Sequence, residues 1–362
     1  MNNRKTLSIL VKPSSSLCNL HCRYCFYLDE SKNRLVPSHG IMKEETMNRL
    51  IERIVEFLEG KGVANISFQG GEPLVCGPGY FRRFIARMKE YPDIETHYSI
   101  QTNGTLITDE IAELFHENKF LVGVSLDGYE ENMNYFRLGK DGTNVYHKVL
   151  EGIELLRKHE VDFNILTVIT RELARHPKAL FDSYLENGFE YVQLIPCLPA
   201  LENEDDGMSL TPELFASFYK SFFKTWKKNY ERGRYLNVNL FENLMGMLKG
   251  YPPYQCGMIG RCTIQYVVEA NGDVYPCDFY CLDEFRMGNV LTDTIEDLQA
   301  SEGAMKMLTN SFCEKTPCRT CRFRNICYGG CQRQNVCYLN EEYCGYKDAL
   351  ETIAPQLYEL VR

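Results

Sequence analysis

Strand-like and helix-like segments alternate along residues 6–230, and this alternation constrains the fold more than any other feature. The apolar, strand-like runs lie at 7–11, 65–69, 97–101, 120–126, 163–169 and 191–195. Amphipathic, helix-like stretches lie at 43–59, 79–90, 108–117, 144–159, 175–187 and 212–230. Such alternation is typical of a parallel sheet with crossover helices. Six such units favour an α/β fold of the partial-barrel type, a (β/α)6 arrangement, over a doubly wound sheet.

The pattern changes near residue 235. Short strand-like pieces at 265–270 and 272–276 are mixed there with cysteine, glycine and arginine. Such a segment buries little apolar area and is expected to need metal to hold its shape. We therefore predict two domains: a barrel-like domain at 1–235, and a small cysteine-rich domain at 236–362 that ends in a helix.

The chain has 16 cysteines in 362 residues, and they are unevenly distributed. No apolar run approaches the roughly 18 residues of a membrane span, and the first apolar run is too short for a secretory signal. We therefore expect a cytoplasmic protein without a membrane partner, in which many cysteines point to metal rather than disulfides. The net charge of -9 and the absence of a long basic run argue against a nucleic-acid partner.

Three cysteines follow the first strand-like run, in the sequence CNLHCRYC: Cys18, Cys22 and Cys25. Three thiolates can hold three irons of a 4Fe–4S cube and leave the fourth iron open for a ligand, as catalytic metal sites do. The same spacing could instead place three small residues on one helix face. Polar residues between the cysteines, such as His21 and Arg23, argue against that alternative.

The CxxxCxYC pattern after a first strand resembles the signature of radical S-adenosylmethionine (SAM) enzymes. In that family the open iron chelates SAM, and an electron from the cluster cleaves SAM to a 5′-deoxyadenosyl radical that takes a hydrogen atom from the substrate. The cofactor carries the chemistry, and the protein supplies position and exclusion of water.

Three further motifs resemble that family: FQGGEPL at 68–74, QTNGTL at 101–106 and SLDG at 125–128, each after its own strand. Gly70 and Gly71 would let the backbone approach SAM closely, and Glu72 would accept a hydrogen bond from its ammonium group. The resemblance implies further SAM contacts from Tyr24, Asn103, Ser125, Arg137, which would face the carboxylate, and Leu198, beside the adenine.

A second cysteine set lies between residues 256 and 344. Its spacing alone is also compatible with two structural zinc sites. It resembles the SPASM domain that is attached to many radical SAM enzymes, which implies two auxiliary 4Fe–4S clusters. The implied ligands of one cluster are Cys256, Cys262, Cys277 and Cys331, and those of the other are Cys318, Cys321, Cys327 and Cys344. The remaining cysteines, expected to be free thiols, are Cys76, Cys197, Cys281, Cys313 and Cys337.

Nearly the whole chain resembles the anaerobic sulfatase-maturating enzymes, through segments such as LVKPSSSLCNLHCRYCFY and VVEANGDVYPCDFY. Those enzymes oxidise a Cys or Ser in a C/S-x-P/A-x-R sequence of a sulfatase to formylglycine. By resemblance Asp278 is the catalytic base, and Tyr27 and Gln69 contact the substrate. A flavodoxin or ferredoxin is the expected electron donor.

Two departures from the family pattern, Tyr129 after SLDG and the segment ENMNYFR, lie near the loop that carries Arg137. Two alternatives therefore remain. One is a SPASM peptide maturase that forms a thioether crosslink, although such enzymes often have an N-terminal leader-binding domain and only about five residues precede the first strand here. The other is a zinc-stabilised interaction module without catalysis.

Overall fold

The computed structural model describes residues 4–202, 206–309 and 315–362. It divides into two compact units, and each is described separately. The first unit comprises Met1–Ser125, Arg137–Phe163 and Ile264–Leu308, and the second comprises Leu126–Phe136, Asn164–Thr263 and Thr309–Arg362. Each unit thus contains residues from both sides of the boundary predicted at residue 235, and that boundary stays a prediction.

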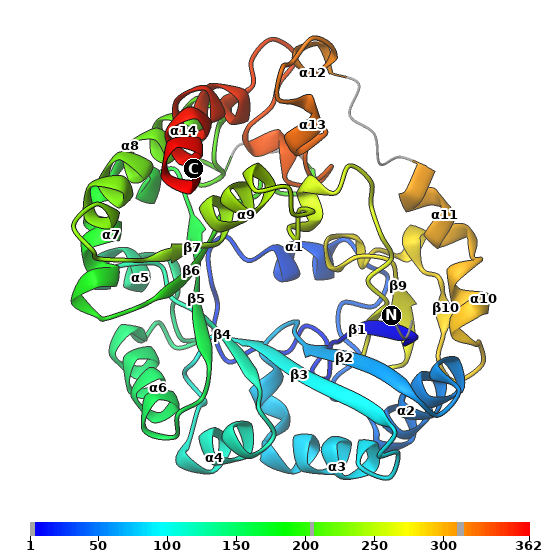
Figure 1. The fold of residues 1–362 in the computed structure, drawn as a ribbon. Coiled ribbons are helices and arrows are strands. Elements are labelled where there is room, and N and C mark those ends of the chain that lie inside the picture. The colour runs from blue at the N-terminus through cyan, green and yellow to red at the C-terminus, as the bar shows by residue number, and fades with distance from the viewer. Residues whose placement is uncertain (1–3, 203–205, 310–314) are drawn as a thin grey trace. The chain divides into compact units, whose positions relative to one another are not determined.

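A mainly parallel sheet forms the centre of the first unit (Figure 1). Its long strands, in spatial order, are β1 (Thr6–Val11), β2 (Gly62–Phe68), β3 (Ile94–Thr102) and β4 (Leu121–Ser125). Three short strands extend the sheet beyond β1: β8 (Val267–Val268), β9 (Asp273–Tyr275) and β10 (Gly288–Asn289). Val11 is paired with Phe68, so the carboxyl ends of β1 and β2 lie side by side. The loops that follow these strands therefore share one edge of the sheet.

Helices cover the outer face of this sheet (Figure 1). They are α2 (Glu44–Leu58), α3 (Pro78–Met88), α4 (Asp109–Glu117) and α6 (Tyr146–Lys158). Phe68 of β2 packs edge-on against Phe81 and Phe84 of α3, with ring centroids 5.2 Å apart in both pairs. Shorter helices are α1 (Phe26–Lys32), α10 (Ile295–Gln299), α11 (Glu302–Thr309), η1 (Pro73–Cys76), η4 (Asp278–Tyr280) and η5 (Asp283–Phe285).

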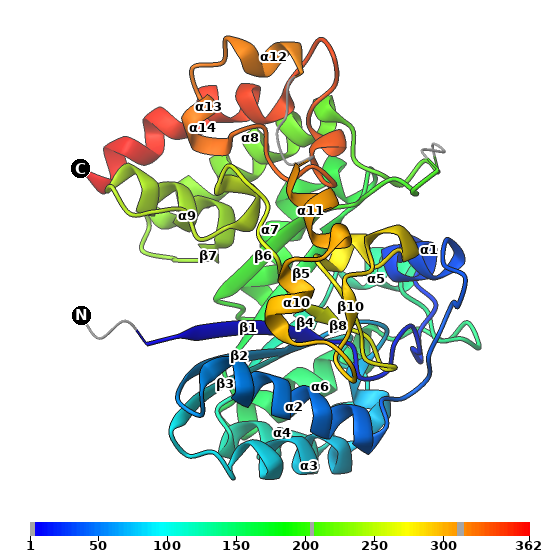
Figure 2. The same ribbon diagram turned by 90° about the vertical axis from the view of Figure 1, so that its right-hand side faces the viewer.

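The second unit contains the parallel strands β5 (Phe163–Ile169), β6 (Tyr191–Pro196) and β7 (Asn237–Val238). Its helices are α5 (Glu130–Phe136), α7 (Pro177–Glu186), α8 (Pro212–Tyr230), α9 (Asn239–Leu248), α12 (Thr316–Arg319), α13 (Arg324–Cys327), α14 (Gly345–Val361), η2 (Leu173–Arg175), η3 (Cys256–Met258) and η6 (Asn335–Cys337). The terminal helix α14 packs beside α8 (Figure 2), where the rings of Phe215 and Tyr346 stack 5.5 Å apart.

The predicted alternation of strands and helices is confirmed through α8, and most helix ends fall within two residues of the prediction. The sequence prediction lacked α1 and α5, which are seven residues long each. No helix in the described part of the chain is long and apolar enough to cross a membrane.

Candidate active site

The loop after β1 carries Cys18, Cys22 and Cys25 and leads directly into α1. The backbone N–H of Cys25 donates to the carbonyl of Cys22 at 3.3 Å, which turns the loop tightly. The Cys18 sulfur lies 3.3 Å from the N–H of Leu20 and 3.8 Å from the side-chain nitrogen of Asn103. N–H donors near a sulfur are what a thiolate ligand requires. The loop therefore fits a cluster held by three thiolates.

Gly70 and Gly71 allow this loop to lie against the end of β2. A Cβ on Gly71 would lie 2.2 Å from the carbonyl oxygen of Leu17, the residue before Cys18. A Cβ on Gly70 would lie 2.7 Å from the Cε of Lys12. Both glycines also have positive φ angles, which other residues rarely adopt. Their predicted proximity to SAM stays a prediction, and the structure adds close packing as a second reason for glycine.

Glu72 connects the FQGGEPL segment to the QTNGTL segment through hydrogen bonds. Its fully buried carboxylate accepts hydrogen bonds from the N–H of Leu74 at 3.0 Å, the hydroxyl of Thr102 at 2.8 Å and the N–H of Asn103 at 2.7 Å. Burial raises the pKa of Glu72 to about 7, although these donors lower it. The predicted contact with the SAM ammonium would use the lone pairs that remain.

Two other predicted SAM contacts of the first unit, Asn103 and Arg137, approach the loop that carries the three cysteines. The Asn103 side chain donates to Asn19, next to Cys18, at 2.9 Å. The Arg137 guanidinium approaches the Cys22 sulfur to 4.0 Å and lies over the Tyr24 ring, 5.4 Å from its centroid. Ser125, at the end of β4, accepts from Gln101 at 3.0 Å. Their roles toward SAM stay predictions.

The predicted adenine contact, Leu198, belongs to the second unit. It follows β6 and is largely buried, with 9% of its surface exposed. Its role also stays a prediction.

Asp278 lies with Tyr27 and Gln69, although the three residues are far apart in the sequence. The Tyr27 hydroxyl donates to Oδ2 of Asp278 at 2.6 Å, and Nε2 of Gln69 donates to the same oxygen at 2.8 Å. Nε2 of Gln69 also lies 2.6 Å from the Tyr27 hydroxyl. Oδ1 of Asp278 has no partner in the described structure, and burial raises the pKa of this carboxyl. The predicted base and both predicted substrate contacts thus form one group.

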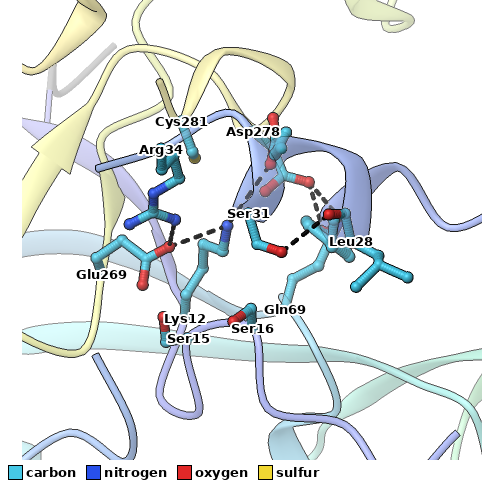
Figure 3. Close-up of polar contacts among 12 residues, drawn as sticks. Lys12, Ser15, Ser16, Leu28, Ser31, Arg34, Gln69, Glu269, Asp278 and Cys281 are labelled. Atoms are coloured by element: carbon cyan, nitrogen blue, oxygen red, sulfur yellow. Dashed lines mark hydrogen bonds and ion pairs between the residues drawn. The ribbon is translucent and has the colours of Figure 1, made fainter. Parts of the chain in front are cut away.

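Sequence reasoning missed a buried ionic cluster beside this group (Figure 3). Its members are Lys12, Glu30, Arg34 and Glu269. Lys12 and Arg34 lie 3.1 and 2.7 Å from the same oxygen, Oε1 of Glu269. Burial raises the pKa of Glu269, but the two cations outweigh it and lower the pKa to about 2. The available sequence signals were a lysine directly after an apolar strand and a glutamate within VVEA.

The second unit contains a cavity lined by four predicted ligands: Cys318, Cys321, Cys327 and Cys344. Aromatic side chains, including Tyr338 and Tyr346, line the same cavity. Cys344 caps the N-terminus of α14, and its sulfur accepts from the N–H of Lys347 at 3.3 Å. Four thiols around one enclosed space fit a cluster with four protein ligands.

Three predicted ligands of the other auxiliary cluster, Cys256, Cys262 and Cys331, also belong to the second unit. The side chain of Gln332 donates to the Cys262 sulfur at 3.4 Å. Cys277 belongs to the first unit, so this set of four ligands stays a prediction. Within residues 4–202, 206–309 and 315–362, no three His, Cys, Asp or Glu side chains converge closely enough for a single metal ion.

The cysteines expected to be free thiols differ in burial. Cys197, Cys281 and Cys337 are buried, and the Cys337 thiol approaches the carbonyl of Cys197 to 3.3 Å. Cys76 is half-buried. Cys313 lies outside the described residues.

Two family models match the chain. The model of the radical SAM superfamily matches residues 13–183, and that of the SPASM iron–sulfur cluster-binding domain matches residues 256–322. The predicted radical SAM and iron–sulfur character of the two regions is thereby confirmed. The second match identifies the region 256–322 with iron–sulfur cluster binding and overturns the zinc alternative.

The cysteine-type anaerobic sulfatase-maturating enzyme of Clostridium perfringens (strain 13 / Type A) is 38% identical over 97% of both chains. The chain belongs to the anaerobic sulfatase-maturating enzymes. The serine-type member of this family from Bacteroides thetaiotaomicron is 30% identical and covers 98% of this chain and 91% of its own length.

A solved sulfatase-maturating enzyme, native anSMEcpe with bound AdoMet and Kp18Cys peptide, has the same fold. Its TM-score is 0.90 at 35% identity, and the match covers 99% of each chain. The predicted fold class, a partial radical SAM barrel followed by a SPASM domain, is therefore confirmed.

Proposed function

We propose that this protein oxidises a cysteine of a sulfatase, within a C/S-x-P/A-x-R-like sequence, to formylglycine. The convergence of Tyr27, Gln69 and Asp278 carries the proposal, because the carboxyl group of the candidate base accepts hydrogen bonds from both candidate substrate contacts. Cysteine is preferred to serine as the target because identity is 38% to the cysteine-type relative and 30% to the serine-type one.

The proposed reaction removes two hydrogens from the cysteine side chain. When bound, the clusters and SAM supply the radical that takes one hydrogen atom from Cβ and the acceptor for one electron. Asp278 takes the thiol proton. The resulting thioaldehyde reacts with water, which replaces sulfur by oxygen and releases hydrogen sulfide.

Two features of Asp278 suit the role of base. Its Oδ2 is held by two donors, Tyr27 and Gln69, so the orientation of the carboxyl group is fixed. Its Oδ1 is buried and unpartnered in the described structure, so one oxygen remains to accept a proton. With only 7% of its surface exposed, the carboxyl group is largely shielded from water.

The cysteines that bind each cluster are also part of the proposal. Cys18, Cys22 and Cys25 would hold the cluster that binds SAM, and the two later sets would hold the auxiliary clusters. The flavodoxin or ferredoxin donor and the cytoplasmic location remain predictions of the sequence.

A peptide assay tests the proposal. Anaerobically reconstituted protein is incubated with SAM, a strong reductant and a peptide containing C-x-P-x-R, and the peptide mass is measured. Exchange of sulfur and two hydrogens for one oxygen is the expected result. Loss of two hydrogens with sulfur retained would instead support the thioether-forming peptide maturase.

A further inference from the structure

Lys12 is buried at the end of β1, with 2% of its surface exposed, and no sequence motif had assigned it a role. Its ammonium group lies 3.1 Å from Oε1 of Glu269 (Figure 3). It also lies 3.9 Å from Oε2 of Glu30. A buried ammonium group is costly unless it is paired. The buried position of Lys12 therefore depends on its carboxylate partners, Glu269 and Glu30.

Lys12 contacts the segments that carry the candidate catalytic group. Its ammonium lies over the Tyr27 ring, 4.8 Å from the centroid. Its aliphatic stem occupies the space that Gly70 leaves, because a Cβ there would lie 2.8 Å from Cγ of Lys12. Gly70 directly follows Gln69. Lys12 thus contacts Tyr27 directly and packs against Gly70, the residue next to Gln69.

Lys12 is also tied to the segment that leads to Asp278. Its backbone N–H donates to the carbonyl of Val268 at 2.8 Å, and its ammonium pairs with Glu269 on the same segment. Glu269 directly follows β8, and the antiparallel strand β9 leads from this turn to Asp278. One side chain therefore links the loop after β2, helix α1 and the β8–β9 segment.

We infer that Lys12 is a positioning residue that holds Tyr27, Gln69 and Asp278 in the arrangement that the reaction requires. The inference rests on the proposed function, because it concerns the same group. A shift of about 1 Å in a catalytic group can cost on the order of 100-fold in rate. Lys12 acts through its neighbours and has no chemical step of its own.

Arg34 offers a matched control. It is buried, carries the same charge and binds the same oxygen of Glu269 at 2.7 Å. Its guanidinium lies over Tyr275 rather than over Tyr27. Loss of either cation leaves Glu269 paired with the other one, whereas Lys12→Met also removes the ammonium group that lies 3.9 Å from Glu30.

The test compares Lys12→Met, Arg34→Met and the wild type, each reconstituted anaerobically and matched for iron content. Deoxyadenosine and formylglycine are measured in one reaction with SAM, reductant and the C-x-P-x-R peptide. In Lys12→Met, formylglycine formed per deoxyadenosine should fall by at least ~10-fold, whereas Arg34→Met should keep the wild-type ratio. A purely structural role would lower both products together and leave the ratio unchanged.

Peptide affinity is measured separately, by fluorescence anisotropy without SAM. It should change by less than about threefold in Lys12→Met, because the loss is expected in kcat rather than in binding. Lys12→Gln, which keeps a donor toward Glu269, replaces Lys12→Met if the latter does not load clusters. An unchanged product ratio in the Lys12 variant, or an equal fall in Arg34→Met, overturns the inference. Wild-type protein that makes deoxyadenosine but no formylglycine overturns the proposed function itself.

Discussion

The two cysteine sites that lie within single units differ in how the chain builds them. In the first unit, Cys18, Cys22 and Cys25 lie on one short loop, and polar groups of neighbouring loops approach their sulfurs. In the second unit, four cysteines spread over residues 318–344 surround one cavity with aromatic walls. With three ligands the first arrangement would leave a coordination position for a reacting molecule, whereas the second would enclose a cluster with four ligands. Changes at the first site should therefore lower SAM cleavage, and changes at the second should lower the stability of the folded protein.

The largest effect is expected from Cys22→Ala. With one of three thiolates missing, the cluster of the first unit should not assemble, and deoxyadenosine formation from SAM should fall below detection. Iron content should drop by roughly a third, since the other two clusters keep all their ligands. Cys76→Ala, which removes no predicted ligand, is the control. Retained SAM cleavage in Cys22→Ala would contradict the assignment of the open site.

Asp278→Asn should separate radical formation from product formation within the first unit. Asn keeps the shape of the side chain and can still accept from Tyr27, but it cannot take the substrate proton. Formylglycine should fall by roughly 100-fold or more while deoxyadenosine formation continues. Both products are quantified in one reaction by mass spectrometry. Unchanged formylglycine would remove Asp278 from the mechanism.

Cys344→Ala tests the contrasting role of the second unit. Loss of this ligand should lower the thermal unfolding midpoint by several degrees, because cluster binding contributes directly to folding energy. Anaerobic thermal unfolding, followed together with iron content, measures the effect. Cys337→Ala, a buried cysteine outside the predicted ligand sets, controls for the loss of a buried thiol. Equal midpoints for the two variants would argue against a stabilising cluster at Cys344.

The last prediction concerns the pH dependence of stability at Glu30. Burial raises the pKa of Glu30 from 4.5 to about 8, in surroundings that include Lys12, Arg34, Asp278 and Cys281. At pH values between 4.5 and about 8, the folded protein therefore binds more protons at Glu30 than the unfolded chain does. Glu30 therefore lowers the unfolding free energy as pH rises, by up to about 1.4 kcal/mol per pH unit.

Glu30→Gln removes this titration. Its unfolding midpoint relative to the wild type should rise steadily between about pH 5 and pH 8. The exposed Glu45→Gln serves as the matched control for removing a carboxylate. A constant difference between Glu30→Gln and the wild type across this range would mean that Glu30 is already ionised in the folded protein.

Local sequence patterns predicted the fold well where a segment's own periodicity decides its structure. The strands β1 to β6 and the longer helices between them follow from apolar spacing, because one buried face is enough to define each element. The short helix α1 escaped notice because seven residues show too little periodicity. The short strands β8 to β10 have two or three residues each and are defined by their pairing within the sheet rather than by their own periodicity.

The sequence by itself determined the strand–helix alternation and the three-cysteine loop, since ligands on one loop need only a short, regular spacing, whereas the auxiliary ligand sets came from resemblance. It also suggested Asp278, Tyr27 and Gln69 one by one, through resemblance. Only the tertiary structure decided that these three side chains meet, and that Lys12 is buried behind them against Gly70 and Glu269. Contacts between residues up to 251 positions apart depend on strand register and loop packing, which no local periodicity records.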